Sequence, residues 1–537
     1  MAAHRGVHGR AALGGSAARG SLGFLQYFLS FSYNLHDSSV SIADERRVLL
    51  VLEAERFFGE KKKACTHAEM EQLVKVALDQ CGIGIDAVTS VACTAYRNEH
   101  LPEKLRDVRW LDETRIQLGG RSFDTLIVNH HLSHAAMVHA FPQATDTVID
   151  VCDGGGDFGD THFVYRCRNG RIEALPNQPI HDAFSSRFYD IVSRYLYGRI
   201  MCEGKLMALA SLGQPRPDIM SFLREHLPMF HGAPPEQSVA ELRRKYPVEH
   251  YSRSQTAFDL AASVQRLFED LRVESVLALP REAPFVLLAG GATLNIVANS
   301  RVRQAIGPGR QLLLPPCCDD TGQSLGALLL HCHERVGAKV TAALPFLGYS
   351  DRLGERPLAP ADVSDQLVSF LVGGGIVFLH RGQSEIGPRA LGHRSILALP
   401  SRRSFDLINH VIKQREFYRP LAPLVTRETV GKWFEFEGES KYMLYSADAR
   451  PETMLAAPGI CHYDRSARVQ TVDGAEDPFL HALLAQVGQA TGIPILINTS
   501  LNGRGMPIAS KLTETLSFRR SLPDLGLRVF HGGQFCD

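Results

Sequence analysis

The chain has 537 residues, of which 45% are hydrophobic and 22% are charged. A single hydrophobic core stops growing at roughly 250–300 residues, so this length predicts at least two domains. Lysine plus arginine and aspartate plus glutamate both number 58, which gives a formal net charge of zero. A balanced charge argues against a broad nucleic-acid surface, and apolar runs well short of the roughly 20 residues of a membrane helix predict a soluble protein.

The cysteines and the first residues bear on the cellular compartment. The 11 cysteines are odd in number and mostly scattered, with no CxxC pair, so we expect a reducing cytoplasm and not a disulfide scaffold. Residues 1–21 contain three arginines and no acidic residue, a composition similar to that of a transit peptide. We interpret them as a disordered tail and leave them out of the fold prediction.

Strands and helices alternate in the first half of the chain. Apolar periodicity predicts helices over residues 67–80 and 130–141. A glycine-rich turn joins the last two of the predicted strands, which makes them a hairpin. The predicted strands cover residues 24–31, 40–42, 48–52, 126–128, 147–151 and 161–165.

The second half continues this pattern and includes a domain boundary. We predict helices over residues 259–279 and 321–331, and the strands 285–288, 312–314 and 376–379. Three prolines and two glycines fall between residues 340 and 362. We therefore expect one domain over residues 22–345 and another over 346–537, with α/β architecture.

The turn Gly154–Gly159 fits the G-x-G-x-x-G pattern of dinucleotide-binding proteins. That pattern needs a helix after the turn, whereas a strand is predicted here, so NAD binding is disfavoured. A glycine-rich hairpin can still offer backbone N–H groups to phosphate, although a plain hairpin turn explains it equally well. With the turns at 36–39 and 288–295, the layout is similar to that of the actin-like, sugar-kinase-like folds.

Two histidines four residues apart suggest a metal site. His130 and His134 lie on one face of a predicted helix and could share one ion, and the glutamate of a HExxH protease is absent between them. Asp153 and Asp320 are the candidate carboxylates, with Asp319 as a competitor of Asp320. Two histidines and two aspartates suit Fe²⁺, Mn²⁺ or Zn²⁺ better than Mg²⁺, and the alternative is a simple polar helix face.

Basic residues concentrate in residues 381–420, where eight lysines and arginines face three acidic residues. Arg402 and Arg403 follow Pro400 and are typical of a solvated surface. Arg389 and Arg394 lie beside glycines and a proline in a turn, which favours a basic pocket for anionic substrates.

Eight strings occur in order along nearly the whole chain: His-Asp-Ser-Ser (36–39), Glu-Ala-Glu-Arg (53–56), Asn-His-His-Leu-Ser-His-Ala (129–135), Asp-Gly-Gly-Gly (153–156), Glu-Gly-Lys-Leu-Met-Ala-Leu-Ala (203–210), Leu-Ala-Gly-Gly-Ala-Thr-Leu-Asn (288–295), Ile-Gly-Pro-Arg-Ala-Leu-Gly-His-Arg-Ser (386–395) and Ile-Asn-Thr-Ser-Leu-Asn (497–502). Together they resemble the NodU-type O-carbamoyltransferases of nodulation-factor and antibiotic biosynthesis. The chain departs from that pattern at Leu501, at Gly505–Pro507 and at Tyr463–Arg465.

The resemblance implies an actin-like (ASKHA, RNase H-like) N-terminal domain and an α+β YrdC-like C-terminal domain. It implies an ATP-dependent O-carbamoyltransferase that converts carbamoyl phosphate into a carbamoyl-adenylate in the second domain. The carbamoyl group then passes to a hydroxyl of a small natural product at the metal site of the first domain. The implied cofactors are Fe²⁺ or another divalent metal and ATP with Mg²⁺. We expect no membrane or nucleic-acid partner, and leave open a homodimer.

The resemblance also assigns roles to residues. The metal ligands would be His130, His134, Asp153 and Asp320, and His36 would be the general base that activates the hydroxyl. A strand-end histidine bonded to the backbone is the alternative for His36. The nucleotide and carbamoyl-adenylate would contact Gly154, Gly155, Gly290, Gly291 and Asn295. Carbamoyl phosphate and ATP would contact Arg389, Lys413, Arg419, Arg468, Asn498 and Ser500.

Other segments and other functions stay open at this point. Glu203 and Lys205 could reach the site or pair with each other, Lys61–Lys63 are typical of a solvated run, and residues 214–256 could face the acceptor. One alternative function is threonylcarbamoyl modification of tRNA, which the zero net charge disfavours. Another is an actin-like ATPase or kinase, against which the basic second domain argues.

Overall fold

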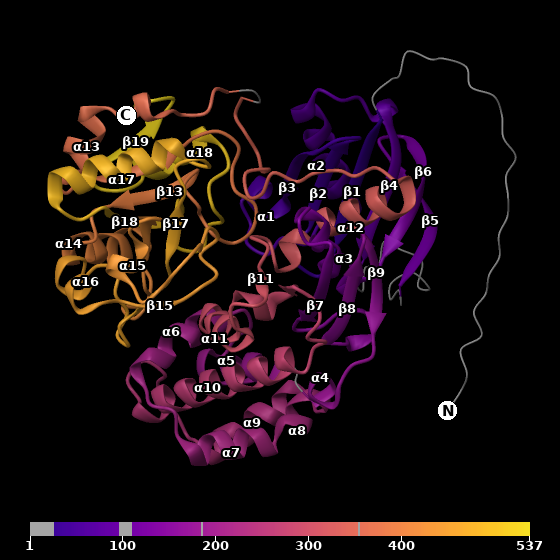
Figure 1. Cartoon of the computed structure of the whole chain (residues 1–537), viewed down its shortest axis with the longest axis horizontal. Coiled ribbons are helices and arrows are strands. Elements are labelled where there is room, and N and C mark those ends of the chain that lie inside the picture. Colours follow the sequence, from indigo (N-terminus) through magenta and orange to yellow (C-terminus); the bar gives the residue numbers. More distant parts are fainter. Residues whose placement is uncertain (1–25, 96–109, 184–185, 353–354, 537) are drawn as a thin grey trace, which may run out of the picture.

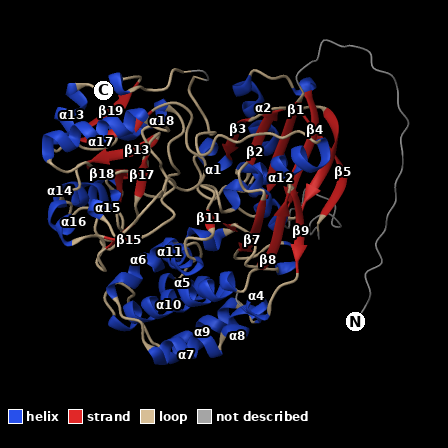
Figure 2. Ribbon diagram, viewed as in Figure 1, coloured by secondary structure: helices blue, strands red, loops and turns tan. Residues whose placement is uncertain are grey.

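The computed structural model describes residues 26–95, 110–183, 186–352 and 355–536; the predicted tail over residues 1–21 lies outside them. Figure 1 shows three parts: two sheets built from strands within residues 27–313, a helical segment below them, and a third sheet from the last third of the chain. We call everything up to residue 345 the first lobe and the remainder the second lobe. Figure 2 shows that strands and helices are mixed in both.

The first sheet has six strands in the order β3-β2-β1-β4-β6-β5. β1, β2 and β3 form an antiparallel meander, β4 and β6 run parallel to β1, and β5 is an antiparallel edge. Helix α2 (His67–Cys81) packs on β2 and β3, starts at a capping box between Thr66 and Glu69, and ends at Gly82. The strands are β1 (Tyr27–Tyr33), β2 (Ser39–Asp44), β3 (Val48–Glu53), β4 (Val88–Ala95), β5 (Leu111–Leu118) and β6 (Arg121–Val128).

The second sheet has five strands in the order β11-β10-β7-β8-β9, with β10 parallel to both of its neighbours. Its strands are β7 (Asp146–Cys152), β8 (His162–Arg168), β9 (Arg171–Leu175), β10 (Phe285–Ala289) and β11 (Gln311–Leu313). Helices α3 (His130–Ala136) and α12 (Gln323–Leu330) pack on each other, and α12 also contacts β1, β2 and β4. Every residue of both helices is buried, so polar side chains on them face the protein interior.

A helical segment lies below the two sheets in Figure 1. The predicted helix over residues 259–279 is confirmed as α10 (Gln255–Leu277), which packs against α5, α6, α7 and α11. The segment 214–256 was expected only as an insertion and contains three helices, two of which begin at the prolines Pro217 and Pro235. The other helices here are α4 (Pro179–Ala183), α5 (Arg187–Tyr197), α6 (Glu203–Leu209), α7 (Pro217–Glu225), α8 (Leu227–Gly232), α9 (Pro235–Lys245) and α11 (Ile296–Ile306).

The third sheet forms the second lobe and has seven strands in the order β17-β14-β18-β13-β12-β19-β20. Leucines of α13 (Asp365–Val372) and α17 (Pro478–Thr491) join an apolar cluster on one face of it, and Phe518 of α18 (Leu512–Arg520) joins one on the other. The remaining helices are α14 (Arg402–Asp406), α15 (Val430–Trp433) and α16 (Pro451–Ala456). The strands are β12 (Ile376–His380), β13 (Arg394–Ala398), β14 (Ala422–Thr426), β17 (Gln470–Val472), β18 (Ile495–Ser500), β19 (Leu527–His531) and β20 (Gln534–Phe535).

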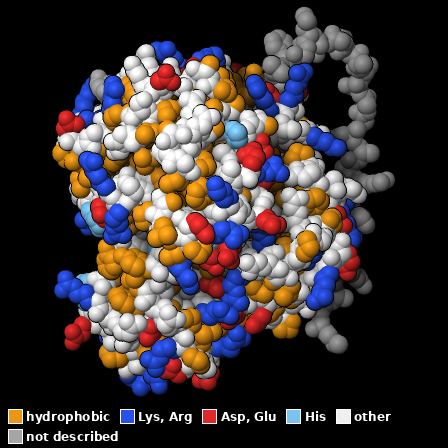
Figure 3. All heavy atoms as spheres, turned by 60° about the vertical axis from the view of Figure 1, so that its left-hand side comes forward, with side chains coloured by type: hydrophobic (Ala, Val, Ile, Leu, Met, Phe, Trp, Pro, Cys, Tyr) orange, Lys and Arg blue, Asp and Glu red, His pale blue; other side chains and the backbone are white. Residues whose placement is uncertain are grey.

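The two lobes share a hydrophobic interface. One apolar cluster contains Val286 and Leu288 of β10 together with Ile396 of β13 and Val425 of β14. The predicted α/β class is confirmed, whereas the boundary at residue 345 and the actin-like and YrdC-like assignments stay predictions. Among the helices of the described residues, none combines the length and apolar character that crossing a membrane requires. Basic and acidic side chains are interspersed on the face that Figure 3 shows, as the zero net charge suggests.

Candidate active site

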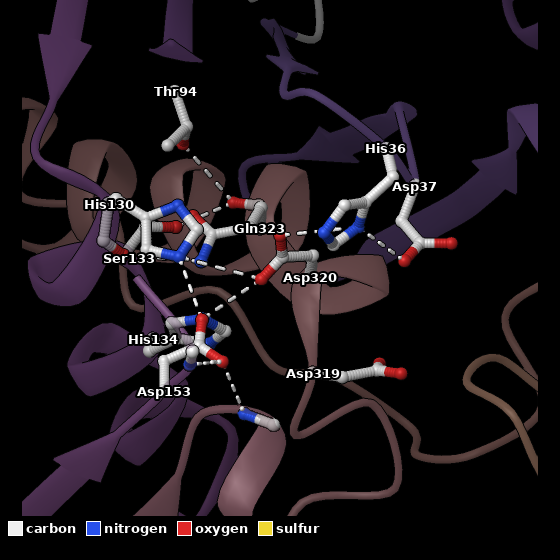
Figure 4. A network of polar contacts seen from close by, with 12 residues as sticks. His36, Asp37, Thr94, His130, Ser133, His134, Asp153, Asp319, Asp320 and Gln323 are labelled. Atoms are coloured by element: carbon white, nitrogen blue, oxygen red, sulfur yellow. Dashed lines mark hydrogen bonds and ion pairs between the residues drawn. The ribbon is translucent and has the colours of Figure 1, made fainter. Parts of the chain in front are cut away.

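The two predicted metal-binding histidines lie on α3, between the two sheets of the first lobe. Asn129 caps this helix by accepting a hydrogen bond from the Leu132 N–H at 3.0 Å, and the Asp157 carboxylate accepts one from the His130 N–H at 2.8 Å. Asp157 therefore holds the start of the helix. The i,i+4 spacing places the His130 and His134 rings on the same side (Figure 4).

Four predicted ligands meet at one point: His130, His134, Asp153 and Asp320 each offer one atom within 4.8 Å of all the others. The Nε2 atoms of His130 and His134 lie 3.0 Å and 3.4 Å from Oδ2 of Asp153, and 3.5 Å and 3.4 Å from Oδ1 of Asp320. Asp319 points away from the histidines in Figure 4 and accepts a hydrogen bond from the Thr321 hydroxyl. The structure thus places Asp320, and not its neighbour, in the group.

This donor set fits a divalent cation of the Fe²⁺, Mn²⁺ or Zn²⁺ type. Nε2 of His134 is buried and, within the described residues, has no hydrogen-bond partner of good geometry, as expected of a ligand atom. Burial by itself raises the pKa of Asp153, but His130 and His134 together hold it well below its usual range. The carboxylate is therefore anionic, and two imidazoles with two carboxylates match the preference of these ions.

The predicted glycines bring two turns together around Asp153, the turn after β7 and the turn after β10. The N–H groups of Gly154 and Gly291 donate to Oδ1 of Asp153 at 2.8 Å and 2.9 Å, which fixes the carboxylate from behind. Gly290 has a φ of +85°, and a Cβ there would lie 2.3 Å from the Cys152 carbonyl oxygen. Gly154 and Gly291 thus orient a predicted metal ligand, and Gly155 lies in the same turn as Gly154. Their contact with a nucleotide stays a prediction.

Asn295 is occupied by structural contacts. Its side-chain oxygen caps α11 by accepting from the Ala298 N–H at 3.1 Å, and its amide exchanges hydrogen bonds with Gln265 at 3.0 Å. The hydrogen bonds account for both ends of the carboxamide, so helix capping explains this residue without a nucleotide.

His36 adjoins the group formed by His130, His134, Asp153 and Asp320, which we call the metal group. Its Nδ1 lies 2.9 Å from Oδ2 of Asp37 and 3.6 Å from Oδ2 of Asp320, and 31% of its side chain is exposed. Burial lowers the pKa of His36, but the Asp37 and Asp320 carboxylates outweigh it and raise the pKa to about 9. The neighbour of its ring is a carboxylate and not the backbone, which favours the catalytic interpretation over the alternative. Asp37 was not predicted to have a role.

Lys62 is 40% exposed, as expected of a solvated run, but it also makes a specific ion pair. Its Nζ lies 2.6 Å from Oδ2 of Asp37, the same oxygen that His36 approaches. Burial lowers the pKa of Lys62, yet the charges of Asp37 and Asp319 raise it overall. Lys62, Asp37 and His36 therefore form a charged row that ends at the metal group, and no sequence signal distinguished Lys62 from its neighbours.

A second group of side chains consists of Lys61, Arg389, Lys413, Arg415, Arg419 and Arg468, which we call the cationic cluster. The pKa of Lys413 lies well below its usual value, first because the side chain is buried and then because of the positive charges of Arg415, Lys61, Arg419 and Arg468. The pKa of Arg468 is also well below its usual value, because of burial and then because of three other arginines of the cluster. Such mutual repulsion at half-buried positions is stable only where anions balance it, so the cluster is suited to polyanions.

Two predicted residues of β18, Asn498 and Ser500, adjoin the cluster, and the neighbouring Asn502, which was not predicted, does so as well. Lys413 Nζ donates to the Ser500 carbonyl oxygen and hydroxyl at 2.5 Å and 3.0 Å, and to Oδ1 of Asn502 at 2.7 Å. Asn498 donates to the Ala390 carbonyl at 3.2 Å, beside Arg389. All six residues expected to contact carbamoyl phosphate and ATP thus lie in one region. Lys61 and Arg415 were missed, although Arg415 belongs to the basic run.

Within the described part of the chain, Nε of Arg389 and Nε of Arg468 are buried without a hydrogen-bond partner. An unpaired guanidinium donor is costly, and a phosphate oxygen would satisfy it. Asn498 Oδ1 is also buried without a partner, but it is an acceptor and suits an N–H or O–H donor. The two arginine Nε atoms are therefore the unsatisfied donors that suit an anion.

The prediction that Arg394 belongs to the basic pocket is wrong. Its side chain is fully buried and donates to the backbone carbonyls of Arg381, Gly382 and Ser510. It therefore organises the loop around it. Arg402 is exposed and pairs only loosely with Asp406 at 3.4 Å, as expected of a solvated residue.

Lys205 and Glu203 do not pair with each other. Lys205 Nζ lies 2.5 Å from Oε1 of Glu416, which stands between Arg415 and Arg419 of the cationic cluster. Burial, with Asp190 nearby, raises the pKa of Glu203 to about 7. The helical segment thus supplies a counter-charge for Glu416, one of the three acids within the basic run.

The metal group and the cationic cluster adjoin each other across the lobe interface. A Cβ on Gly387, two residues before Arg389, would lie 2.4 Å from the Pro316 carbonyl oxygen, at the start of the turn that carries Asp320. Asp319 also acts electrostatically on Arg389. A small anion held by Arg389 is therefore close to the metal ligands.

Comparison with known proteins agrees with this geometry. The carbamoyltransferase N-terminus model matches residues 114–329, and the carbamoyltransferase C-terminus model matches residues 368–524. Nodulation protein NolNO of Sinorhizobium fredii is 27% identical over 531 residues, which cover 90% of this chain and 76% of that protein. A 3'-hydroxymethylcephem-O-carbamoyltransferase of Streptomyces clavuligerus is 33% identical over 335 residues, which cover 60% of this chain and 62% of that protein.

Two solved structures align at lower similarity. Component A of the (R)-2-hydroxyglutaryl-CoA dehydratase of Acidaminococcus fermentans has a TM-score of 0.34 at 16% identity, over 57% of this chain and 96% of that chain. HypF of T. kodakarensis has a TM-score of 0.33 at 14% identity, over 59% of this chain and 49% of that chain. At these scores the likeness supports no argument.

The matches to both halves of the chain define an enzyme of the carbamoyltransferase class. The chain belongs to the NodU-type carbamoyltransferase family.

Proposed function

We propose that the protein is an ATP-dependent O-carbamoyltransferase with a small hydroxylated acceptor. The observation that carries the proposal is the position of the cationic cluster beside the histidine–aspartate group. One holds polyanions such as carbamoyl phosphate and ATP, and the other suits a cation that acts on a carbonyl or phosphoryl oxygen.

In this proposal the second lobe makes the activated carbamoyl group. Carbamoyl phosphate releases phosphate with consumption of one water, and the carbamate then attacks the α-phosphorus of ATP. Carbamoyl-adenylate and pyrophosphate are the products. Arg389 and Arg468 hold the anions through donors that are otherwise unsatisfied, and Lys413 is fixed by Ser500 and Asn502 at the same place.

Transfer follows in the first lobe. The neutral form of His36, which is the minor form at neutral pH given a pKa of about 9, accepts the proton of the acceptor hydroxyl as the oxygen attacks the carbamoyl carbon, and AMP leaves. Asp37 and Lys62 orient the imidazole. A divalent ion held by His130, His134, Asp153 and Asp320 would supply Lewis acidity for the oxygen that gains charge. The product is a carbamate ester of the acceptor.

The actin-like and YrdC-like assignments are part of this proposal. The meander β1–β3 followed by the parallel strands β4 and β6 supports the first, because the same order is expected of the ribonuclease H-like half of an actin-like fold. The named relatives support an acceptor among cephem-type antibiotics or nodulation factors.

The experiment combines the protein with ATP, Mg²⁺, Fe²⁺, carbamoyl phosphate and a panel of hydroxylated compounds. We expect AMP, pyrophosphate and phosphate in equal amounts, and an acceptor heavier by one carbamoyl group in the mass spectrum. Release of ADP would instead indicate a kinase or ATPase. Absence of AMP with every divalent metal contradicts the proposal.

A further inference from the structure

A buried ion pair of the first lobe is bonded to the second lobe. Glu53 ends β3 and Arg56 lies in helix α1 (Ala54–Phe58), and their side chains are only 4% and 3% exposed. Arg56 Nε lies 2.7 Å from Oε2 of Glu53. The remaining polar atoms of the pair face one turn of the second lobe, which ends two residues before Arg389.

The contacts with that turn are specific. The Gly387 N–H donates to Oε1 of Glu53 at 2.6 Å. Arg56 donates through Nη1 to the Glu385 carbonyl oxygen at 2.6 Å and through Nη2 to the Gly387 carbonyl oxygen at 2.5 Å. The fork of one guanidinium thus spans two carbonyls, a geometry that an ammonium group cannot reproduce.

The loop beyond the turn is stiff. The Glu385 carboxylate accepts from the backbone N–H groups of Leu391 at 2.5 Å and Arg394 at 3.3 Å, which closes the loop on itself. Arg394 is fully buried and fills the loop with hydrogen bonds to carbonyls. A shift of Gly387 would therefore move Arg389 with it.

The other side of the turn is also set by the first lobe. Gly387 has a φ of +89°, and its Cα lies so close to Pro316 and Cys317 that a Cβ would clash with both. The pair and the segment that leads to Asp320 thus enclose one turn between them. Both contacts come from the first lobe, whereas Arg389 belongs to the cationic cluster of the second.

We propose that Glu53 and Arg56 are positioning residues for the adenylation step: they seat the turn at Gly387, and through the stiff loop they set where Arg389 meets its anion. The inference rests on the proposed function, since it assigns an anion to Arg389. Residues of the first lobe then control the affinity of the second lobe for carbamoyl phosphate, without touching the substrate.

The test uses the full chain and compares Arg56→Lys with Glu53→Gln. Arg56→Lys keeps a charge opposite Glu53, so no buried acid is left unpaired, but it loses the fork. Glu53→Gln keeps an acceptor for Gly387. The matched control is Ser300→Ala, which removes a different contact between the lobes, the hydrogen bonds of Ser300 with the Ser446 backbone at 2.7 Å and 2.9 Å.

Carbamoyl-phosphate-dependent pyrophosphate release is measured together with the thermal midpoint. For Arg56→Lys we expect the KM for carbamoyl phosphate to rise at least tenfold, with a smaller change in kcat. Glu53→Gln should also raise this KM. Ser300→Ala should stay within twofold of the parent chain. A purely structural role would lower the thermal midpoint and leave the KM unchanged.

An unchanged KM in both variants overturns the inference, and so does failure of both to fold, because the pair would then serve assembly alone. Pyrophosphate release by the parent chain tests the proposed function separately. If it releases no pyrophosphate from ATP, the proposed function fails, whatever the variants do.

Discussion

Nδ1 of His36 lies 3.6 Å from Oδ2 of Asp320, whose other oxygen faces both histidines of the metal group. One carboxylate therefore connects the proposed base with the proposed metal ion. A hydroxyl positioned near His36 is by the same geometry near the ion, so deprotonation and carbonyl polarisation can act on one acceptor. The arginines of the cationic cluster, all of which belong to the second lobe, are near this point.

The two half-reactions should separate in His36→Ala. The variant is expected to release pyrophosphate at a rate near that of the parent chain, because His36 lies outside the cationic cluster, while carbamate ester formation falls by about 10²–10⁴-fold. Product mass spectrometry and a pyrophosphate assay on the same sample check this. His410→Ala, an exposed histidine of the second lobe, serves as the control and should change neither. Equal loss of both steps would contradict the role of His36.

Neighbouring aspartates offer a matched test of the metal group. Asp320→Asn should weaken Fe²⁺ binding at least tenfold, because one of two anionic ligands is lost, whereas Asp319→Asn should bind as the parent chain does. Metal content after reconstitution and dialysis, measured by elemental analysis, compares the two. Loss of metal from Asp319→Asn, with retention in Asp320→Asn, would reverse the assignment.

The cationic cluster predicts an anion effect on stability. Pyrophosphate or ATP should raise the thermal midpoint of the parent chain, since anions relieve the repulsion among buried cations. In Arg468→Ala this rise should largely disappear, and the KM for ATP should increase by about tenfold or more. Arg402→Ala, with 62% of its side chain exposed, should respond as the parent chain. An undiminished rise in Arg468→Ala would place the anion elsewhere.

We expect Lys205 to affect substrate binding by neutralising the Glu416 carboxylate. Glu416 Oε2 already lies 4.0 Å from Arg419, and without Lys205 it would neutralise that arginine. Lys205→Met is therefore expected to raise the KM for ATP or carbamoyl phosphate several-fold, and the double variant with Glu416→Gln should recover much of the loss. Steady-state kinetics of pyrophosphate release measures both. If the double variant is worse than the single one, the charge argument fails.

A buried histidine away from the site predicts how stability depends on pH. Burial lowers the pKa of His331 to about 4, and its Nε2 lies 2.7 Å from the Ser90 hydroxyl. In the unfolded chain it takes up a proton near pH 6.5, so stability is lost as the pH falls below that value, by about 2 kcal/mol at pH 5. The thermal midpoint of the parent chain should therefore drop between pH 7.5 and 5. His331→Gln should reduce this drop, and an identical pH profile would argue against the role of His331.

Local patterns in the sequence were sufficient for much of the fold and for the metal group. Apolar periodicity alone predicts a helix over residues 67–80, which the structure confirms at residues 67–81. His130 and His134 share a helix face by spacing alone. The residues alone did not distinguish Asp320 from Asp319. Both follow the same turn, and only the folded path of that turn decides which carboxylate faces the histidines.

Other features depend on contacts between distant segments. Arg394 resembles Arg389 in the sequence, but it fills the interior of the loop because buried carbonyls surround it. Lys62 differs from its neighbours only through Asp37, 25 residues away in the chain. The helices α7 to α9 are short and have a proline at their first or second position, so propensity alone gave no prediction for them.

The bonds between Glu53, Arg56 and Gly387 also bear on how such proteins can be recombined. A chimera that joins the first half of one relative to the second half of another would place a buried charge pair against a turn it did not fold with. Residues 53–56 and 385–387 should therefore be exchanged as one unit. In an isolated first half, Glu53 and Arg56 would be exposed at the surface, with three backbone partners replaced by water.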